Sequence, residues 1–499
     1  MVTDTGYKST FDGEPYSIGI AGNQNGNAGQ PVMMREHDTA TCVDGTPRDG
    51  AIPRDSAMSE MWNPMVETMD RTDLRELQVR RFREQAVYAT ENAPFYREKF
   101  DEAGIDPHSI ETMADVRDVP TTSKDELRNA QTTEPAPYGD LLAVPPEEVT
   151  EYHQTSGTTG QPVRQADSWH DWEWWGDCWA TVLWAQGVRP SDRVFFPFSY
   201  NVFVAFWAAH YAAERIGAEV VPGGNLSSVQ RVRTMDDLDV TVFASTPTYA
   251  LRLAEVAEEE GFDPAGMAVE RIICAGEPGA SVPGTKNRME DRWGASVYDH
   301  AGATEAGAWG FTCDGSSTGL HINEASFLVE VLDDDGEPVA EGERGEVVIT
   351  PLMREAQPYV RFELRDLMEV KPGDACDCGR SFRFAEGGVL GRSDDLTKVN
   401  GVLLSPTAIE DTVRRCEVVS DEYRVVIDEH DEKAVDVTTL VCESLPDATA
   451  TDDEIERMLR EDLKEATSLT FQVEVRDYED LGRFELKADR LTDDRPTHV

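Results

Sequence analysis

The chain has 499 residues, which is too long for one ordinary hydrophobic core, so we expect two or three domains. Its 96 acidic residues against 46 basic ones give a formal net charge of -50, which argues against nucleic acid and anionic membranes as partners. The sequence has no apolar run of about 18 residues and no basic segment followed by an apolar one, so we expect a cytoplasmic protein without a membrane span or secretory signal.

The acidic residues are spread along the chain and are not gathered in one tail. Concentrated counterions shorten the range of repulsion between like charges, so we interpret this composition as an adaptation to the salty cytoplasm of a halophilic organism. Eight cysteines in a chain of this length do not indicate a disulfide framework.

Residues 1–60 are rich in Gly, Asn, Asp and Thr without an apolar period, which predicts a flexible extension. A helix should follow, with Thr72 as its N-cap and with Leu74 and Leu77 at helical spacing. Pro94 should close this helix, because a proline ring cannot be accommodated in a helix interior.

A short strand is expected at 149–154, and a loop with little side-chain bulk comes after it. The loop consists of Thr155, Ser156, Gly157, Thr158, Thr159 and Gly160. Glycines let the backbone approach a ligand closely, and N–H groups and hydroxyls together form a cradle for an anion such as a triphosphate. An exposed Gly/Thr turn is the alternative interpretation of these residues alone, and the Walker sequence with its lysine is absent.

Tryptophans at three- and four-residue spacing predict a helix with one buried face at 169–184. Short apolar runs then alternate with helical stretches, which favours α/β layering with largely parallel strands. The expected strands are 194–196, 219–221, 240–243 and 271–274, and the expected helices are 204–216 and 249–260.

The pattern changes near residue 325. Strands at 327–332 and 346–350, separated by a turn at 334–336, predict a small β-rich subdomain.

A compact α+β domain is expected beyond Asp394. Its predicted strands are 423–427, 435–441 and a last strand at 471–475. A capping box at 451–454 should open a helix between them. The apolar face of that helix should carry Ile455, Met458, Leu459 and Leu463.

Six motifs occur in a fixed order along the chain. They are the loop at 155–160, then Ala275-Gly276-Glu277-Pro278, 298–305, 359–366, 391–395 and 483–487. In that order they resemble the adenylate-forming acyl-CoA synthetases, most nearly the phenylacetate–CoA ligase branch, from about residue 61 to about residue 490. The resemblance implies a large AMP-binding N-terminal domain at 61–393 and a small mobile α+β lid domain at 394–499.

The resemblance also implies an ATP-dependent acid–CoA ligase. Such an enzyme joins a carboxylate to ATP, giving acyl-AMP and pyrophosphate, and then transfers the acyl group to CoA with release of AMP. The segment 198–203 resembles pocket-lining sequence of aryl-acetate ligases, so an aromatic, phenylacetate-like acid is preferred. The expected partners are this small acid, ATP and CoA, and a homodimer is compatible with the resemblance.

Roles for single residues follow from the same resemblance. The loop at 155–160 and Thr304 would hold phosphate, and Glu305 would hold Mg²⁺ through an oxygen ligand. Lys487 would offset the charge that develops between the carboxylate and the α-phosphate. The nucleoside pocket would use Gly276, Glu277, Pro278, Asp299, Asp366 and Arg392, with Asp366 on the ribose.

The sequence departs from the family pattern at two positions. Gln161 stands where the family usually has a lysine beside the phosphates, and Ala301 stands where many relatives have an aromatic residue over the adenine. Asp394 matches the hinge before the lid.

Cys313, His321, Cys376 and Cys378 form a candidate metal set. Three sulfurs and one imidazole suit tetrahedral Zn²⁺ in a closed, structural site. Some members of the ligase branch carry a similar set, which supports zinc. Buried free thiols are the alternative.

Two other functions remain open from the sequence. The adenylating enzyme could use a different acceptor, such as a carrier protein or a deazaflavin cofactor. Alternatively, Gln161 and Ala301 could mark a non-catalytic nucleotide-binding relative.

Overall fold

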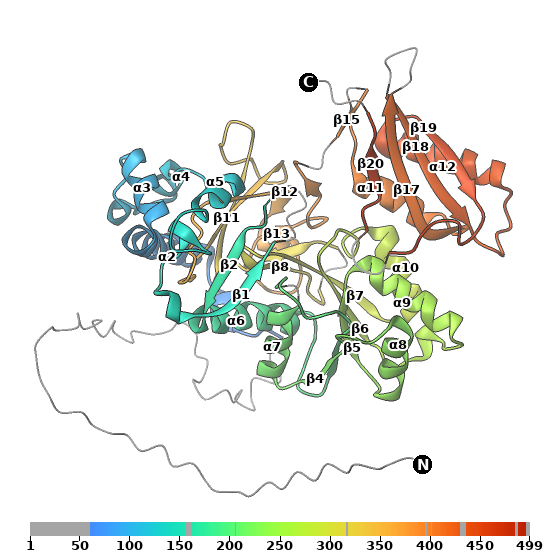
Figure 1. The fold of residues 1–499 in the computed structure, drawn as a ribbon, viewed down its shortest axis with the longest axis horizontal. Helices are drawn as coiled ribbons and strands as arrows, with labels where there is room; N and C mark the ends of the chain where they lie inside the picture. The colour runs from blue at the N-terminus through green and yellow to red at the C-terminus, as the bar shows by residue number, and fades with distance from the viewer. Residues whose placement is uncertain are drawn as a thin grey trace, which may run out of the picture. The chain divides into compact units, whose positions relative to one another are not determined.

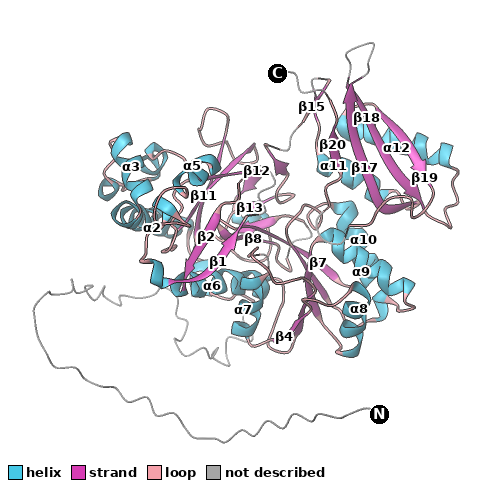
Figure 2. Cartoon of the chain, in the orientation of Figure 1, coloured by secondary structure: helices cyan, strands magenta, loops and turns pink. Residues whose placement is uncertain are grey.

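A computed structural model describes residues 60–155, 161–204, 206–315, 318–394, 397–400, 402–429, 436–484 and 488–495. Three predictions lie outside these residues: the extension at 1–60 except for its last residue, the loop segment Ser156–Gly160, and Lys487. Among the helices in the described ranges, none combines the length and the apolar character that a membrane crossing requires. Figure 2 distinguishes the helices and strands along the chain.

The described chain begins with short helices. They are α1 (Pro64–Glu67), α2 (Arg71–Asn92), α3 (Pro94–Ala103), α4 (Met113–Asp118) and α5 (Lys124–Ala130). The predicted cap of α2 was wrong: Asp70 is the N-cap and accepts from the Thr72 N–H at 2.8 Å. Pro94 follows the end of α2 as predicted, and it is also the first residue of α3, where its missing N–H costs nothing.

A long mixed sheet organises the N-terminal region (Figure 1). Its parallel half has the order β4-β3-β5-β6-β7 and comprises β3 (Arg193–Phe196), β4 (Glu219–Pro222), β5 (Val242–Ser245), β6 (Arg271–Cys274) and β7 (Ser296–Ala303). β3, β5, β6 and β7 are largely buried, as parallel strands covered on both faces must be, whereas the edge strand β4 has no buried residue.

Antiparallel strands continue this sheet beyond β7. In sheet order they are β8 (Gly307–Phe311), β9 (Leu320–Ile322), β13 (Phe384–Ala385), β12 (Phe362–Lys371), β11 (Arg344–Pro351) and β10 (Phe327–Leu332), with β14 (Gly391–Arg392) also paired to β12. β10 and β11 confirm the β-rich segment that the sequence predicts after residue 325. Separately, β1 (Val149–Gln154) and β2 (Arg164–Ser168) form an antiparallel pair.

Helices cover the parallel half of the sheet. They are α6 (Trp169–Ala185), α7 (Trp207–Ile216), α8 (Ser228–Asp237), α9 (Pro247–Glu259) and α10 (Pro283–Trp293). One core joins Phe243 and Ile272 of the strands to Leu253 of α9 and Trp293 of α10. The predicted helix at 169–184 is confirmed by α6, whereas α7 begins three residues later than predicted because 201–204 form an irregular turn.

The C-terminal region is a separate sheet with two helices. The sheet has the order β19-β18-β17-β20. Its elements are β17 (Val419–Glu429), β18 (Asp436–Ser444), β19 (Phe471–Arg476), β20 (Leu491–Asp493), α11 (Pro406–Arg415) and α12 (Asp452–Thr467), preceded by the short pair β15 (Lys398–Val399) and β16 (Val402–Leu403). This arrangement confirms the small α+β domain.

Two details of that domain differ from the prediction. Met458 is 42% exposed, whereas Ile455, Leu459 and Leu463 are fully buried, so the apolar face of α12 is narrower than its sequence suggests. The strand β19 is also not the last one. Leu491 begins β20, which pairs in parallel with β17 at Val425.

Candidate active site

The predicted phosphate loop lies between β1 and β2, and its two ends are joined by hydrogen bonds. The Thr155 N–H donates to the Val163 carbonyl, and the Val163 N–H donates to Thr155 Oγ1, both at 3.0 Å. An antiparallel pair closed in this way holds the two flanks of the loop at a fixed separation. Ser156, Gly157, Thr158, Thr159 and Gly160 themselves are outside the described residues.

Helix α5 packs beside the exit of this loop. Arg128 donates through Nε to the Gln161 carbonyl at 3.1 Å. Gln131, just after the helix, donates to the Pro162 carbonyl and accepts from the Arg164 N–H, both at 2.8 Å. Arg128, Gln161 and Arg164 also line an open cavity of about 490 Å³, so two guanidinium groups stand next to the loop.

The opposite end of α5 reaches Glu305. Lys124 is the first residue of the helix, and its Nζ lies 3.0 Å from Glu305 Oε1. A helix of seven residues is only about 10 Å long, so the loop flank and Glu305 lie close to each other in space. The structure therefore brings a flank of the predicted phosphate loop near the predicted metal ligand, although the two are far apart in sequence.

Glu305 lies in the tight turn from β7 to β8, next to Thr304. Its side chain is only 5% exposed, and the described residues give its Oε1 no hydrogen-bond partner apart from the ion pair with Lys124. A buried carboxylate oxygen without a hydrogen bond is an expensive arrangement unless a cation completes it. The residue thus fits a hard divalent cation such as Mg²⁺.

The other predicted nucleoside residues lie at the carboxyl ends of the parallel strands. Asp299 of β7 pairs in register with Cys274, the last residue of β6, so Gly276 and Pro278 come just beyond this edge. Open α/β sheets bind ligands outside this edge. Burial raises the pKa of Asp299 to about 6, although the Ser281 hydroxyl donates to its carboxylate.

Both carboxylate oxygens of Glu277 are engaged. Oε1 accepts from the Thr248 N–H at 2.8 Å, at the N-terminus of α9, where a negative charge is favoured. Oε2 accepts from the Ala488 N–H at 3.0 Å, in the C-terminal region. The contacts present in the structure therefore place Glu277 against backbone amides, and its role at adenine stays a prediction.

Arg392 and Asp366 face each other on paired strands. They are register partners in β14 and β12, and Arg392 Nη1 lies 3.4 Å from Asp366 Oδ1. Arg392 also holds both carboxylate oxygens of Asp394, at 2.9 and 2.8 Å. One guanidinium thus joins the predicted ribose acid to the predicted hinge.

The candidate zinc ligands converge on one point. Cys313 follows β8, His321 is in β9, and Cys376 and Cys378 precede β13; their four ligand atoms lie within 4.8 Å of one another. Two sulfurs bound to one tetrahedral zinc at about 2.3 Å would lie about 3.8 Å apart. Cys313 Sγ and Cys376 Sγ are 3.5 Å apart.

The imidazole of this set has the orientation that a metal ligand needs. His321 Nδ1 lies 3.2 Å from the Phe382 carbonyl, so Nε2 is directed at Cys378 Sγ, 3.2 Å away. A carbonyl partner on the remote nitrogen fixes the tautomer that leaves the other nitrogen free to ligate. A hydrogen bond from Cys313, with the nearby imidazole, lowers the pKa of the Cys378 thiol. The donor set fits zinc.

Three histidines near the motifs are held by structural contacts. His153 is buried and stacks on Trp172 with ring centroids 5.5 Å apart. His210 is 2.6 Å from the Tyr200 hydroxyl. Burial lowers the pKa of His300 to about 3, so its ring is neutral. These contacts are those of structural histidines, and none of them points to a catalytic base.

Lys124 is the functional candidate that sequence reasoning missed. Its only sequence signal is a lysine directly after Ser123, which caps α5 through a box with Glu126. A lysine there looks like an ordinary exposed helix residue, and only the fold brings it to Glu305.

The chain matches known families over most of the described residues. Residues 85–351 match the family model described as AMP-binding enzyme, and residues 401–495 match the AMP-binding enzyme C-terminal domain. The phenylacetate–coenzyme A ligase of Escherichia coli strain K12 is 32% identical over 72% of this chain and 81% of its own length. The phenylacetate–coenzyme A ligase of Aromatoleum evansii is 30% identical over 86% of this chain and 97% of its own length.

Solved structures of 2-hydroxyisobutyryl-CoA ligase also match. Its postadenylation state, bound to 2-HIB-AMP, gives a TM-score of 0.83 at 30% identity, covering 89% of this chain and 94% of that one. Its thioesterification state, bound to 2-HIB-AMP and CoA, gives a TM-score of 0.67 at 31% identity, again covering 89% of this chain and 94% of that one. On these matches, the chain belongs to the AMP-binding enzyme family and is an AMP-forming acid–CoA ligase that works through an acyl adenylate.

Proposed function

We propose that this ligase activates an aromatic acid similar to phenylacetate. Support comes from a continuous layer of aromatic rings that reaches the motif strand β7. Phe198 packs on Phe206, Phe206 on Trp179, and Trp179 on His300, with centroids 5.3, 6.0 and 4.0 Å apart. His300 precedes Ala301 in the adenylate motif, so the apolar wall lies beside the predicted reaction site. Such a wall favours a flat apolar acyl group.

A small branched hydroxy acid is the second candidate. The 2-hydroxyisobutyryl-CoA ligase is as similar in sequence as the phenylacetate ligases and covers more of the chain than the E. coli enzyme does. The hydroxyl of such a substrate would need a polar partner in the pocket. The aromatic segment offers the Tyr200 hydroxyl, which is paired to His210, beside the polar side chains of Ser199 and Asn201.

An acid panel tests the proposal. Phenylacetate, anthranilate, 2-hydroxyisobutyrate and acetate are incubated with ATP and Mg²⁺, with and without CoA, at high KCl, and pyrophosphate and AMP are measured. We expect phenylacetate to give the highest rate and AMP release to require CoA. A higher rate with 2-hydroxyisobutyrate would establish the second candidate instead. AMP release without CoA would point to a different acceptor.

In the proposed reaction the acid carboxylate attacks the α-phosphorus of ATP, and pyrophosphate leaves. The CoA sulfur then attacks the acyl carbonyl, the thiol proton is lost, and AMP leaves. Glu305 would hold Mg²⁺, which screens the phosphate charge when bound. Lys124 would contact the phosphates from the other side of Glu305, supplying the positive charge that Gln161 lacks.

Glu305→Gln tests the metal assignment. The change keeps the shape and removes one negative oxygen ligand, so the Mg²⁺ concentration for half-maximal pyrophosphate release should rise about tenfold, equivalent to about 1.4 kcal/mol. Mg²⁺ titrations of the rate and of ATP binding measure this. An unchanged Mg²⁺ dependence would show that Glu305 is not the ligand.

Lys124→Met tests the missed cation. The substitution removes the charge beside Glu305 and should weaken ATP binding about tenfold, the loss of about 1.4 kcal/mol. Calorimetric titration with ATP gives the Kd directly. Lys99→Met is the matched control, because Lys99 pairs with Glu126 of the same helix. Equal ATP affinities in the two variants would remove Lys124 from the site.

The zinc set would have a structural role in this proposal. It connects the ends of β8 and β9 to the segment before β13 and includes none of the nucleotide motifs. We propose one zinc per chain, held by Cys313, His321, Cys376 and Cys378.

A further inference from the structure

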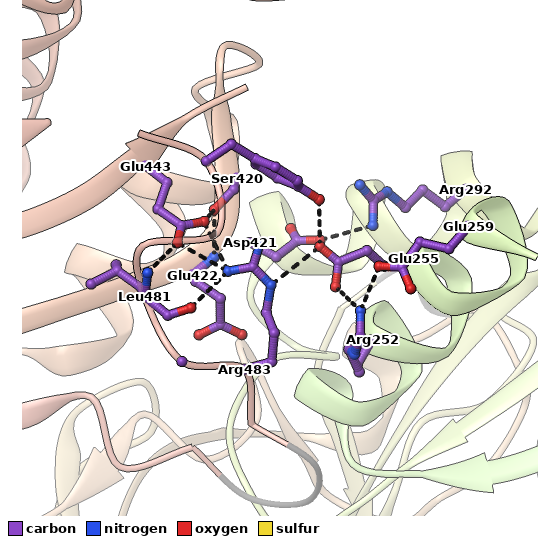
Figure 3. Close-up of polar contacts among 12 residues, drawn as sticks. Arg252, Glu255, Glu259, Arg292, Ser420, Asp421, Glu422, Glu443, Leu481 and Arg483 are labelled. Atoms are coloured by element: carbon purple, nitrogen blue, oxygen red, sulfur yellow. Dashed lines mark hydrogen bonds and ion pairs between the residues drawn. The ribbon is translucent and has the colours of Figure 1, made fainter. Parts of the chain in front are cut away.

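Several contacts join the C-terminal domain to the N-terminal region, among them Gly284 with Asp411 and Thr285 with Glu410. Two further acidic side chains, Glu255 and Asp421, each bind basic residues from both sides. Figure 3 shows Glu255 with Arg252 and Arg483, and Asp421 with Arg292. Glu255 of α9 receives Arg483 Nε at 3.4 Å and the Tyr478 hydroxyl at 2.9 Å. Asp421 of β17 receives Arg288 and Arg292 of α10, each at 2.9 Å. We call these contacts the latch.

The side chains of the latch are largely shielded from solvent. The Glu255 and Asp421 side chains are each 11% exposed, and Arg483 is 16% exposed. Burial opposes ionisation of Asp421, but the three nearby arginines outweigh it and hold its pKa well below the usual range. Partly buried pairs of this kind contribute more than surface pairs, because water and salt screen them less.

Three residues of the latch, Arg483, Asp421 and Glu255, each have a second partner within their own domain. Arg483 is bound by both oxygens of Glu443 at 3.0 and 2.8 Å, and these residues belong to the same C-terminal domain. Asp421 also holds Arg414 of α11 at 2.8 Å. On the other side, Glu255 holds Arg252 of its own helix at 2.6 Å.

This double pairing makes the latch reversible. Breaking a buried ion pair is costly mainly because one charge is left without a partner. If the C-terminal domain moves away, Arg483 retains Glu443, Asp421 retains Arg414, and Glu255 retains Arg252. The contacts across the surface can therefore be lost without leaving Arg483, Asp421 or Glu255 unpaired, and the charges that lose their described ion pairs are those of Arg288 and Arg292 on α10.

The domain orientation is most similar to one of three states solved for a relative, with TM-scores of 0.83 for the postadenylation state, 0.67 for the thioesterification state and 0.68 for an open conformation. The chain superposes better on the postadenylation state of 2-hydroxyisobutyryl-CoA ligase than on its thioesterification state, at equal coverage. The described latch contacts belong to the first orientation. Arg483 is four residues before Lys487, and the Ala488 N–H bound by Glu277 is one residue after it, so both flanks of the lysine are tied to the N-terminal region.

We propose that Glu255 and Asp421 are positioning residues, whose latch selects the adenylating orientation of the C-terminal domain. The inference rests on the adenylation and thioester steps of the proposed function. Weakening the latch reduces the share of molecules ready for adenylation and does not hinder the thioester step.

Two charge-removing variants test the latch from the N-terminal side. Glu255→Gln and Arg292→Gln should each change the ratio of thioester formation to adenylation about fivefold, in favour of thioester formation. The double variant should shift the ratio further than either. Adenylation is measured as ATP-dependent pyrophosphate release, and the thioester step from supplied acyl-AMP and CoA.

Glu259→Gln is the matched control, because Glu259 lies on the same helix and its ion pair is with Arg252. Its ratio should equal that of the unsubstituted protein. Equal losses in both steps, or a ratio shift as large in Glu259→Gln, would overturn the latch while leaving the proposed function intact. Absence of both steps in the unsubstituted protein, across the acid panel, would overturn the proposed function and the latch together.

Discussion

Lys487→Ala is expected to abolish most adenylation and to spare thioester formation. During adenylation a carboxylate approaches an already negative α-phosphate, and a cation beside both lowers the barrier. Loss of such a transition-state contact typically costs about 3 to 4 kcal/mol, on the order of a hundred- to thousand-fold in rate. The thioester step begins from the adenylate, in which the carboxylate and the phosphate are already joined, so their repulsion does not have to be overcome again. Pyrophosphate release and conversion of supplied acyl-AMP measure the two steps.

Lys464→Ala provides the control for this experiment. Lys464 is an exposed lysine in the last turn of α12, in the same domain. It should leave both steps unchanged. If Lys487→Ala slows both steps alike, or if adenylation survives, Lys487 is not the adenylation lysine.

Removing zinc is expected to destabilise the N-terminal domain strongly. Structural zinc contributes several kcal/mol to folding, and about 1 kcal/mol changes Tm by roughly 2 °C in a large domain, so a strong chelator should lower Tm by on the order of 10 °C. Calorimetry with and without the chelator measures the shift, and elemental analysis should find one zinc per chain.

Two cysteine variants separate zinc from simple loss of packing. Cys376 and Cys416 are equally buried, at 7% and 8% exposure, but only Cys376 belongs to the candidate set. Cys376→Ala should no longer bind zinc, so the chelator should lower its Tm only slightly. Cys416→Ala should still bind zinc, and the chelator should lower its Tm as much as in the unsubstituted protein. Zinc-free protein whose three thiols all titrate in the folded state would contradict the site.

The elements that could be predicted from the sequence are those with a strong local signal. The tryptophan spacing predicts the helix α6 correctly, but α6 is buried on nearly all sides and not on one face only. Thr451 with Glu454 predicts the start of α12 by its reciprocal cap. The motif order predicts the family. The four zinc candidates are also brought together as expected.

What could not be predicted depends on contacts that sequence spacing does not encode. Met458 has the spacing of a buried residue, but it is 42% exposed in the folded domain. β20 is only three residues long and forms because β17 offers an open edge. The ion pair of Lys124 with Glu305 depends on how α5 packs against the turn after β7, and the latch depends on how two domains meet.

The basic side of the latch consists of arginines, and this has a chemical consequence. An acyl adenylate is an electrophile that reacts with amines, whereas a guanidinium stays protonated and is a poor nucleophile. Only nine of the 46 basic residues in the chain are lysines, and Arg288, Arg292 and Arg483 supply the contacts to Asp421 and Glu255. If this surface opens and closes in each cycle, as proposed above, it carries its positive charge in a form that an escaping acyl adenylate does not readily acylate.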